Sequence, residues 1–369
     1  MRRSKLIYLN PICYMDTDLS VLKYLNAHYE LIWYPIYYTK ETKYSIQEIE
    51  DYAKSNQIEC RLQLLNCRQR SFYNFKSLLS ILINIRKEKP DILFTSNRIL
   101  YWHILCRLFI GKRKIVQGIH DVIHHSNISL RKFMVLFSNI VYNLYSNYIL
   151  YSKSQLELLK TMTKGNCHFV GMSTKDFGKS KKQYSSITEG VKILFFGGIS
   201  KYKGVDLLIE KVEELYNEGV NNISISICGK GGEYWNGCKK LIKTRSIYNL
   251  DIRLIPNELV ADLMSSHHFL ILPYRDVTNS GPMMIALNYS LPIIAPKIGC
   301  FVDVLNEDSA ILYEQGMLKQ ALLNVSKLTP EEYDNLRQSV KQCSERYSEP
   351  NIASNYIYCF DRIINNNEY

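Results

Sequence analysis

Residues 192–212, KILFFGGISKYKGVDLLIEKV, combine residue types that together suit phosphate binding. An apolar run ends at a glycine pair (197–198), a basic loop with Lys201 and Lys203 follows, and Gly204 precedes an amphipathic helical pattern. Glycine lets the backbone come close to a ligand, and the first amides of a helix are unpaired at the positive end of its dipole. Lysine adds a mobile cation. The pattern predicts a strand, a turn and a helix N-terminus that binds phosphate.

A second candidate lies at Ser280, Gly281 and Pro282, between an apolar strand pattern and an apolar helix pattern. Serine is a good N-cap, proline suits the first helical turn, and the glycine amide can bind an anion. The same residues also make a good helix cap without a ligand, so both interpretations remain open. A third glycine turn, CGKGG at 228–232, follows another apolar run and carries a weaker signal of the same kind.

Three histidines, at 120, 124 and 125, follow the apolar run 114–119. A lone histidine is usually structural, but three within six residues at a strand end favour a functional site. They lack the ligand spacing with carboxylates that a metal site needs, and the chain has no CxxC pair. We therefore expect no metal.

Short apolar runs alternate with helical patterns, which predicts an α/β fold with mostly parallel sheets. Strands are expected at 5–10, 31–38, 91–97, 114–120, 147–152, 167–171, 192–198, 224–231, 251–256, 268–274 and 291–296. The polar stretch 179–190 has no periodicity and is expected to be a linker. The prediction is a first domain at 1–178, a second at 190–346, and a terminal helix at about 347–369.

Charge is distributed unevenly along the chain. The net charge is +13 over residues 1–180 and −2 over residues 181–369. A basic half could meet nucleic acid, an anionic membrane surface or an anionic substrate, or be no more than solvated helix faces. No apolar run reaches the roughly 18–20 residues that span a bilayer. The stretch 131–148, with a basic start and an aromatic body, is either an interfacial helix or a buried one.

Three stretches of the second half resemble glycosyltransferase family 4, GT-B enzymes that move a sugar from a nucleotide diphosphate donor. They are FFGGISKYKGVDLLIE (195–210), LDIRLIPNELVADLMSSHHFLILPY (250–274) and YRDVTNSGPMMIALNYSLPIIAPKIGCFVDVL (274–305). In the first half, IHDVIHHS (119–126) is similar to the family's His-Asn/Asp-x-x-Pro-His turn.

The resemblance implies a role for particular residues. Lys203 would hold the donor diphosphate, with the amides of Gly197 and Gly198 against it and Lys201 as a second cation. The nucleotide and sugar would be lined by Gly229, Arg275, Asp276, Ser280, Gly281, Pro282 and Met283. In the first domain His120 would face the donor sugar, with Asp121 beside it and His125 as the second histidine of the turn.

The resemblance also implies a whole architecture. Two Rossmann-like, doubly wound domains would face a cleft, and the C-terminal helix would cross back to the first domain. The expected enzyme retains anomeric configuration and uses a UDP- or GDP-sugar without a metal or other cofactor. Its acceptor would be a saccharide or lipid-linked saccharide in bacterial surface polysaccharide synthesis. It would be cytoplasmic, with peripheral contact at the inner face of the plasma membrane.

The chain departs from the family pattern in the sugar loop and the phosphate loop. The window 274–288 has no glutamate, and Gly198 and Ser200 stand where the family has arginines. One alternative is therefore a degenerate protein that binds a sugar nucleotide or a partner without turnover. A sugar-nucleotide epimerase would need more carboxylates around the sugar loop. A nucleic-acid binder fits the basic half, but no recognisable binding module is present, so no nucleic-acid partner is expected.

Overall fold

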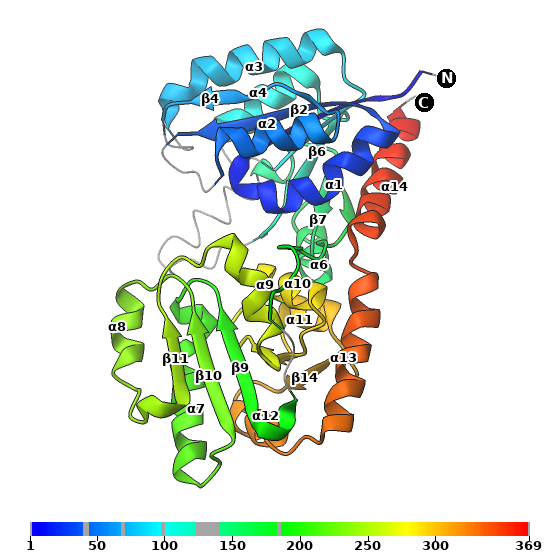
Figure 1. Ribbon diagram of the computed structural model, residues 1–369. Helices are drawn as coiled ribbons and strands as arrows, with labels where there is room; N and C mark the ends of the chain where they lie inside the picture. Colours follow the sequence, from blue (N-terminus) through cyan, green and yellow to red (C-terminus); the bar gives the residue numbers. More distant parts are fainter. Residues whose placement is uncertain are drawn as a thin grey trace. The chain divides into compact units, whose positions relative to one another are not determined.

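The structure is a computed structural model that describes residues 2–39, 44–67, 71–96, 100–122, 140–182 and 186–367 of the 369-residue chain. The chain divides into two compact units (Figure 1). The first comprises Met1–Ser173 together with Glu349–Tyr369, and the second comprises Thr174–Ser348.

In the described part of the first unit, eight strands form one sheet in the order β3-β2-β1-β5-β6-β7-β8, with β4 paired to β2. Every registered pair is parallel. The strands are β1 Lys5–Pro11, β2 Glu30–Tyr38, β3 Glu59–Cys60, β4 Gln63–Leu65, β5 Ile92–Thr95, β6 Ile115–Ile119, β7 Asn147–Leu150 and β8 Asn166–Phe169. The helices are η1 Ile12–Tyr14, α1 Met15–His28, α2 Ile46–Ser55, η2 Phe72–Asn74, α3 Phe75–Glu88, α4 Leu100–Ile110, α6 Lys153–Lys160 and α14 Glu349–Asn367.

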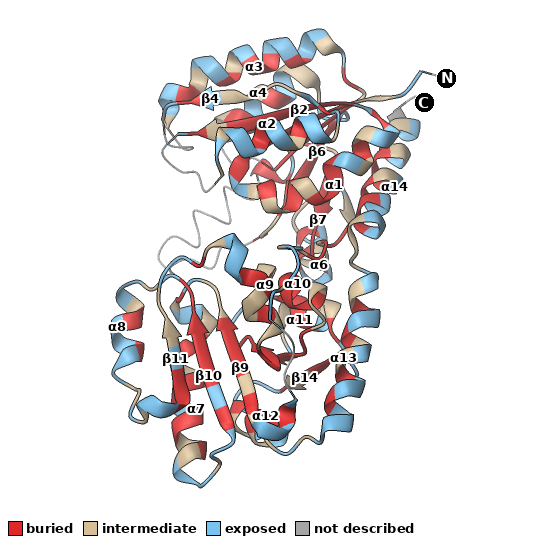
Figure 2. Ribbon diagram, viewed as in Figure 1, coloured by how far each residue is buried: buried red, intermediate tan, exposed pale blue. Residues whose placement is uncertain are grey.

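Parallel strands are covered by helices on both faces, so their residues are apolar almost continuously. All residues of β5 and β6 are buried, and β1 is buried from its second residue onward. The helices bury only one stripe: in α3, Leu78, Ile81, Leu82 and Ile85 are buried and the opposite face is exposed (Figure 2).

The terminal helix α14 packs on the first unit, as predicted (Figure 1). The Tyr29 hydroxyl donates a hydrogen bond of 2.7 Å to Asp361, and Lys23 of α1 forms a 2.6 Å ion pair with Glu349 at the start of the helix. Tyr356 and Phe360 lie with their rings against Phe94 of β5. The chain therefore returns to the first unit after completing the second.

In the described part of the second unit, six strands form a parallel sheet in the order β11-β10-β9-β12-β13-β14. The strands are β9 Val191–Phe196, β10 Ile223–Cys228, β11 Tyr248–Asp251, β12 Phe269–Ile271, β13 Ile293–Pro296 and β14 Ala310–Tyr313. The helices are η4 Ile187–Glu189, η5 Lys201–Lys203, α7 Val205–Asn217, α8 Glu233–Lys239, η6 Arg245–Ile247, α9 Asn257–Ser265, α10 Gly281–Asn288, α11 Gly299–Val304, α12 Leu318–Val325 and α13 Pro330–Glu345.

Both sheets have the strand order of a doubly wound fold, which confirms the predicted fold class. The order reverses between β9 and β12 in the second unit, and between β1 and β5 in the first. Ligands of such sheets bind beyond the carboxyl ends of the strands at this switch point. The glycine turn after β9 and the loop after β12 lie at that position. The predicted cleft between the two domains stays a prediction.

Two sequence-based boundaries differ from the structure. Residues 251–256 were expected to form a strand, but β11 spans Tyr248–Asp251 and the chain then leaves the sheet toward α9, with Leu254 73% exposed. The first unit ends at Ser173, whereas the prediction placed its end at 178. The reason is local: the Thr174 amide donates to Tyr347 O, and the Lys175 amide to Met284 O, so this segment packs on the second unit.

Candidate functional site

The loop between β9 and α7, residues 197–204, is called the phosphate loop below. An ideal Cβ placed on Gly197 would lie 3.1 Å from Lys203 Nζ and 3.6 Å from Pro282 Cγ. The Lys203 ammonium therefore folds back over the first glycine of the loop, next to the start of α10. Residues distant in the sequence are brought together here because β9 and β12 are neighbours in the sheet.

Two glycines let the backbone segments of this corner touch. Gly204 has φ +68°, and a Cβ there would lie 2.0 Å from the carbonyl oxygen of Pro273, which follows β12. Gly229 has φ +152°, and a Cβ there would lie 2.0 Å from Gly197 O. A side chain at either position would push apart the ends of two neighbouring strands. Gly229, predicted to lie near a nucleotide, thus holds the phosphate loop against the end of β10.

Lys203 is half-buried between aromatic rings. Its Nζ lies 5.9 Å from the ring centroid of Tyr202 and 5.7 Å from that of Tyr274. Within the described residues no carboxylate lies at ion-pair distance from this ammonium. Burial lowers the pKa of Lys203 to about 8. A buried cation that carries its charge at a cost is stabilised by an anion beside it.

Some backbone amides of the phosphate loop and of the start of α10 already donate hydrogen bonds within the protein. We predicted that the Gly197 and Gly198 amides both lie against a phosphate, but the Gly197 amide donates to Cys228 O at 2.9 Å, so that prediction is wrong for this amide. At the start of α10, Ser280 Oγ accepts the Met283 amide at 3.3 Å, and Pro282 has no N–H. The Gly198 and Gly281 amides have no acceptor among the described residues. These two remain as backbone donors for an anion.

Arg275, predicted to line the nucleotide and sugar, is paired with an acidic side chain. Its guanidinium makes two hydrogen bonds to Asp206 in the first turn of α7, at 2.9 and 2.6 Å, and another to Lys201 O at 2.6 Å. Burial opposes the ionised form of Asp206, but the Arg275 hydrogen bonds prevail and lower the pKa of its carboxyl group. Arg275 therefore cross-links the sugar loop, residues 274–283, to the phosphate loop. Whether it also contacts a ligand stays a prediction.

The other predicted residues of the second unit vary in exposure. The Met283 side chain is buried in the core at 2% exposure, so only its backbone faces the corner. Asp276 and Lys201 are exposed beside the two loops. Their contacts with a donor stay predictions.

Sequence reasoning missed Asp206 and Lys175. Asp206 is an acidic residue in the first turn of α7, and this pattern could have suggested a partner for the nearby arginine. Lys175 lies in the segment assigned to the first domain, and nothing in its surroundings in the sequence points to the site. An ideal Cβ on Gly281 would lie 3.7 Å from Lys175 Nζ. A second ammonium group therefore lies near the N-terminus of α10.

His120 of the first unit directly follows β6 at the carboxyl edge of that sheet. Its ring is stacked between Tyr14, at 4.4 Å and an interplanar angle of 4°, and Tyr151, at 4.3 Å and 22°. Two aromatic neighbours hold the imidazole plane in one orientation. Asp121 follows it and is half-buried. His125 lies outside the described residues.

The first unit also contains a buried polar network around Asp18 of α1. Asp18 Oδ1 accepts hydrogen bonds from the Tyr8 hydroxyl at 2.8 Å and from Asn10 Nδ2 at 2.9 Å. The Ser96 amide donates to Asn10 Oδ1 at 2.6 Å. Burial raises the pKa of Asp18 to about 7, although the hydrogen bonds from Tyr8 and Asn10 lower it. The network ties β1 to β5 at the switch point of the first sheet.

No group of three His, Cys, Asp or Glu side chains in the described ranges is arranged to hold a metal ion. Of the helices that the structure describes, none combines the length and hydropathy needed to cross a bilayer.

Most of the second unit is similar to a known family. Residues 190–328 match the family model described as Glycosyl transferases group 1. A GDP-mannose:glycolipid 4-beta-D-mannosyltransferase of Xanthomonas campestris pv. campestris is 26% identical over 140 residues, which is 36% of this chain and 38% of the relative. The same enzyme of another strain matches over 30% of its length. The chain thus spans less than two-fifths of each of these curated relatives.

Solved structures match the entire chain. A glycosyltransferase from Rickettsia africae ESF-5 has a TM-score of 0.71 and 12% identity, with 99% of both chains covered. Anabaena Alr3699/HepE in complex with UDP and glucose has a TM-score of 0.70 and 12% identity, with 97% of this chain and 100% of that chain covered. These likenesses show the GT-B fold. Assignment to family 4 stays a prediction.

Proposed function

We propose that this chain, a GT-B protein whose second unit is a group 1 glycosyltransferase domain, is a retaining glycosyltransferase. It would move a sugar from a nucleotide diphosphate sugar to a saccharide or lipid-linked saccharide acceptor. The observation that carries the proposal is Lys203, a half-buried ammonium folded over Gly197 beside Pro282, at the switch point of the second sheet.

Binding of the donor diphosphate uses this charge. An anion beside Lys203 favours its protonated form, so part of the cost of burying the ammonium is recovered on binding. The Gly198 and Gly281 amides supply hydrogen bonds, and the Lys175 ammonium lies at the same helix start. Arg275 and Asp206 hold the two loops in register instead of contributing a free charge. Lysines and helix dipoles would take the place of a metal or other cofactor.

The same groups assist the chemical step. The bond between the anomeric carbon and the phosphate oxygen breaks, and its electron pair stays on the nucleoside diphosphate. Charge therefore develops on an oxygen close to Lys203, where a preorganised cation and amides lower the barrier. The acceptor oxygen bonds to the anomeric carbon on the same face, and its proton passes to the leaving phosphate. No separate base is then required.

His120 is the residue of the first unit proposed to face the donor sugar, with Asp121 and His125 beside it. Stacking between Tyr14 and Tyr151 fixes the imidazole plane, as a residue that orients a sugar hydroxyl requires. The stereochemical outcome is tested by the anomeric configuration of the product, determined by NMR. An inverted product would contradict the same-face transfer.

We propose a UDP- or GDP-sugar as the donor, and the names of the relatives support this proposal. The Xanthomonas relatives are named for GDP-mannose and a glycolipid, and the Anabaena structure contains UDP and glucose. A glycolipid acceptor supports a role in bacterial surface polysaccharide synthesis, at the inner face of the plasma membrane. The exposed apolar residues Phe72 (71%), Tyr73 (88%) and Leu108 (70%) of the basic first unit support peripheral membrane contact. Of the segment 131–148, predicted to be an interfacial or a buried helix, residues 131–139 lie outside the described residues. In its described half Val141, Tyr142 and Tyr145 are buried and β7 begins at Asn147, so this half does not form an interfacial helix.

The decisive experiment measures slow donor hydrolysis with UDP- and GDP-sugars, together with nucleotide affinity. Wild-type protein is compared with Lys203→Ala, Lys201→Ala and the exposed control Lys240→Ala of the second unit. We expect hydrolysis of one donor class and a loss of affinity of roughly tenfold or more in Lys203→Ala. Affinity unchanged in both loop variants would refute the site. Binding without turnover of any donor would favour a degenerate sugar-nucleotide binder, and an altered sugar without release would favour an epimerase.

A further inference from the structure

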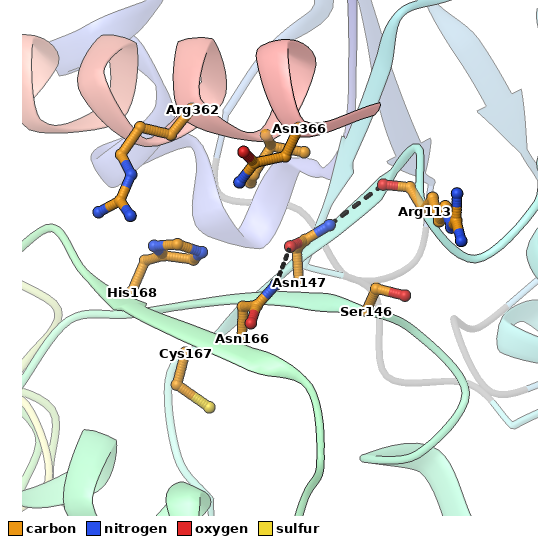
Figure 3. A pocket seen from close by; sticks show the side chains of 9 residues that line it. Arg113, Ser146, Asn147, Asn166, Cys167, His168, Arg362 and Asn366 are labelled. Carbon is orange, nitrogen blue, oxygen red and sulfur yellow. Dashed lines mark hydrogen bonds between the residues drawn. The ribbon is translucent and has the colours of Figure 1, made fainter. Parts of the chain in front are cut away.

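A polar pocket of about 500 Å³ lies in the first unit at the amino ends of the strands (Figure 3). It is formed by the segments that begin β6, β7 and β8 and by the last turns of α14. Its polar lining includes Arg113, Asn147, Asn166, His168, Arg362 and Asn366. His120 follows the carboxyl end of β6, so this pocket lies at the opposite edge of the same sheet. The proposed glycosyl transfer makes no use of it.

The lining is cationic. Two guanidinium groups, those of Arg113 and Arg362, border the pocket, and its described lining contains no Asp or Glu. Arg362 has its Cζ 5.7 Å from the ring centroid of Tyr358 on the same helix. Within the described ranges no carboxylate pairs with Arg362. An arginine fork that faces a cavity without a carboxylate suits a phosphate or carboxylate ligand.

His168 on β8 supplies a second, independent observation. Its Nε2 is buried and has no hydrogen-bond partner among the described residues. Burial, together with the positive charge of Arg362, lowers the pKa of this imidazole. Figure 3 shows the Arg362 side chain extending from α14 toward His168. Because Nε2 has almost no exposed surface, a ligand in the pocket would reach the other edge of this half-buried ring. The negative charge of such a ligand would offset the repulsion between Arg362 and a protonated His168.

The asparagines of the pocket are prearranged. Asn147 Nδ2 donates to Arg113 O at 3.1 Å, and Asn166 Nδ2 donates to Asn147 Oδ1 at 3.2 Å, so both amides are fixed in orientation (Figure 3). The Asn366 amide, on the last turn of α14, borders the same space. Fixed amides beside a cationic pair can bond to the hydroxyl groups of a small organic anion. The volume falls in the range of small-molecule sites.

We propose that this pocket is a binding site for a small phosphate monoester that carries hydroxyl groups, with its phosphate held between Arg362 and His168. The phosphate accepts hydrogen bonds from the guanidinium and from the imidazolium, and the asparagine amides contact the hydroxyl groups. The site is separate from the phosphate loop, and its existence does not depend on the transferase activity.

The test observes His168 itself, because inorganic phosphate is also expected at the phosphate loop. The imidazole resonance is assigned with His168→Gln and titrated with pH, without and with inorganic phosphate or glycerol 3-phosphate. We expect a saturable shift, a higher pKa of His168 when ligand is present, and tighter binding of glycerol 3-phosphate than of inorganic phosphate. Glycerol should give no shift. A His168 resonance that does not respond to either phosphate would overturn the proposal.

Variants of Arg362 test whether its guanidinium binds the phosphate. Arg362→Gln should weaken the His168 response roughly tenfold or more, because a charge-assisted bond is lost, and Arg362→Lys should retain part of it. Arg86→Gln, an exposed arginine of α3 in the same unit, is the matched control and should behave as wild type. Equal ligand affinity in wild type and Arg362→Gln would overturn the assignment. Lys203→Met should leave the His168 response intact, which separates this site from the proposed donor site.

Discussion

Replacing Lys203 by methionine should make the ligand-free protein more stable and the nucleotide complex weaker. The pKa of Lys203 is lowered from 10.5 to about 8 by burial, with no hydrogen bond or charge acting in the other direction. One pKa unit corresponds to about 1.4 kcal/mol, so keeping the charge in the empty loop costs roughly 2–3 kcal/mol after allowance for solvent screening. Methionine has similar length and no charge, so Lys203→Met removes this cost.

The sign of the pH dependence follows from the lowered pKa. Below about pH 8 the native and unfolded chains both carry the proton, and the full cost is present. Between about pH 8 and 10.5 only the unfolded chain keeps the proton, so the cost fades as the pH rises. Urea unfolding should therefore show Lys203→Met more stable by roughly 2–3 kcal/mol at pH 7, with the difference nearly gone near pH 10.

Nucleotide affinity of the wild-type protein should fall as the pH rises, whereas its stability should increase. A bound diphosphate favours the charged lysine, so affinity for UDP or GDP should fall about tenfold between pH 7 and 9 as the free ammonium loses its proton. In Lys203→Arg the guanidinium stays charged, and in Lys203→Met no charge is present, so both variants should lack this fall. Calorimetric titrations at three pH values measure it, with Lys240→Met as control. A Lys203→Met protein that is less stable at pH 7 and binds nucleotide as wild type would refute the reasoning.

Three further predictions concern the scaffold. Arg275→Lys and Asp206→Asn should each raise the KM for donor. A double-mutant cycle on the free energy of unfolding should give a coupling energy of about 1–3 kcal/mol between the two residues. Additive effects would show that the ion pair does not hold the loops together. Gly204→Ala should cost at least about 2 kcal/mol, because an added Cβ meets a backbone carbonyl at 2.0 Å, whereas Gly219→Ala, with φ +90° and open space, should cost about 1 kcal/mol. Equal losses would refute the close approach. The pKa of Asp18 is raised to about 7, so its contribution to stability is full below about pH 4 and is lost as the pH rises to 7. In urea unfolding, Asp18→Asn should therefore be more stable than wild type by roughly 1–3 kcal/mol at pH 8. At pH 4 the two proteins should differ little.

The strands were the best predicted part of the fold. Buried parallel strands consist almost entirely of apolar residues, and β1, β2 and β9 could be located from that pattern within a residue or two. β10 ends at Cys228, three residues before its predicted end. The misplaced strand at 251–256 has only three apolar positions that alternate with or adjoin Asp251, Arg253 and Pro256, and β11 begins earlier, at Tyr248. A short apolar run does not show which of its residues reach a neighbouring strand, because that is decided by pairing with β10.

Some residues of the candidate site could be predicted from the sequence and others could not, because some act through partners far along the chain. The glycines and Lys203 stand in one continuous segment, so local sequence was sufficient to point to them. Asp206 and Lys175 gain their significance from partners far along the chain, Arg275 and Gly281. The Gly197 amide was predicted to lie against the donor diphosphate, and only the structure shows that it donates to Cys228 O.

The sequence by itself determined the alternation of strands and helices, the glycine and lysine pattern of residues 197–204 that predicts phosphate binding, and the resemblance to a family. Those properties depend on residue type and spacing along the chain. The tertiary structure decided which charges remain for a ligand. Arg275 is neutralised by Asp206, whereas Lys203 is buried with its charge unpaired among the described residues, because β9 and β12 meet at the point where the strand order reverses.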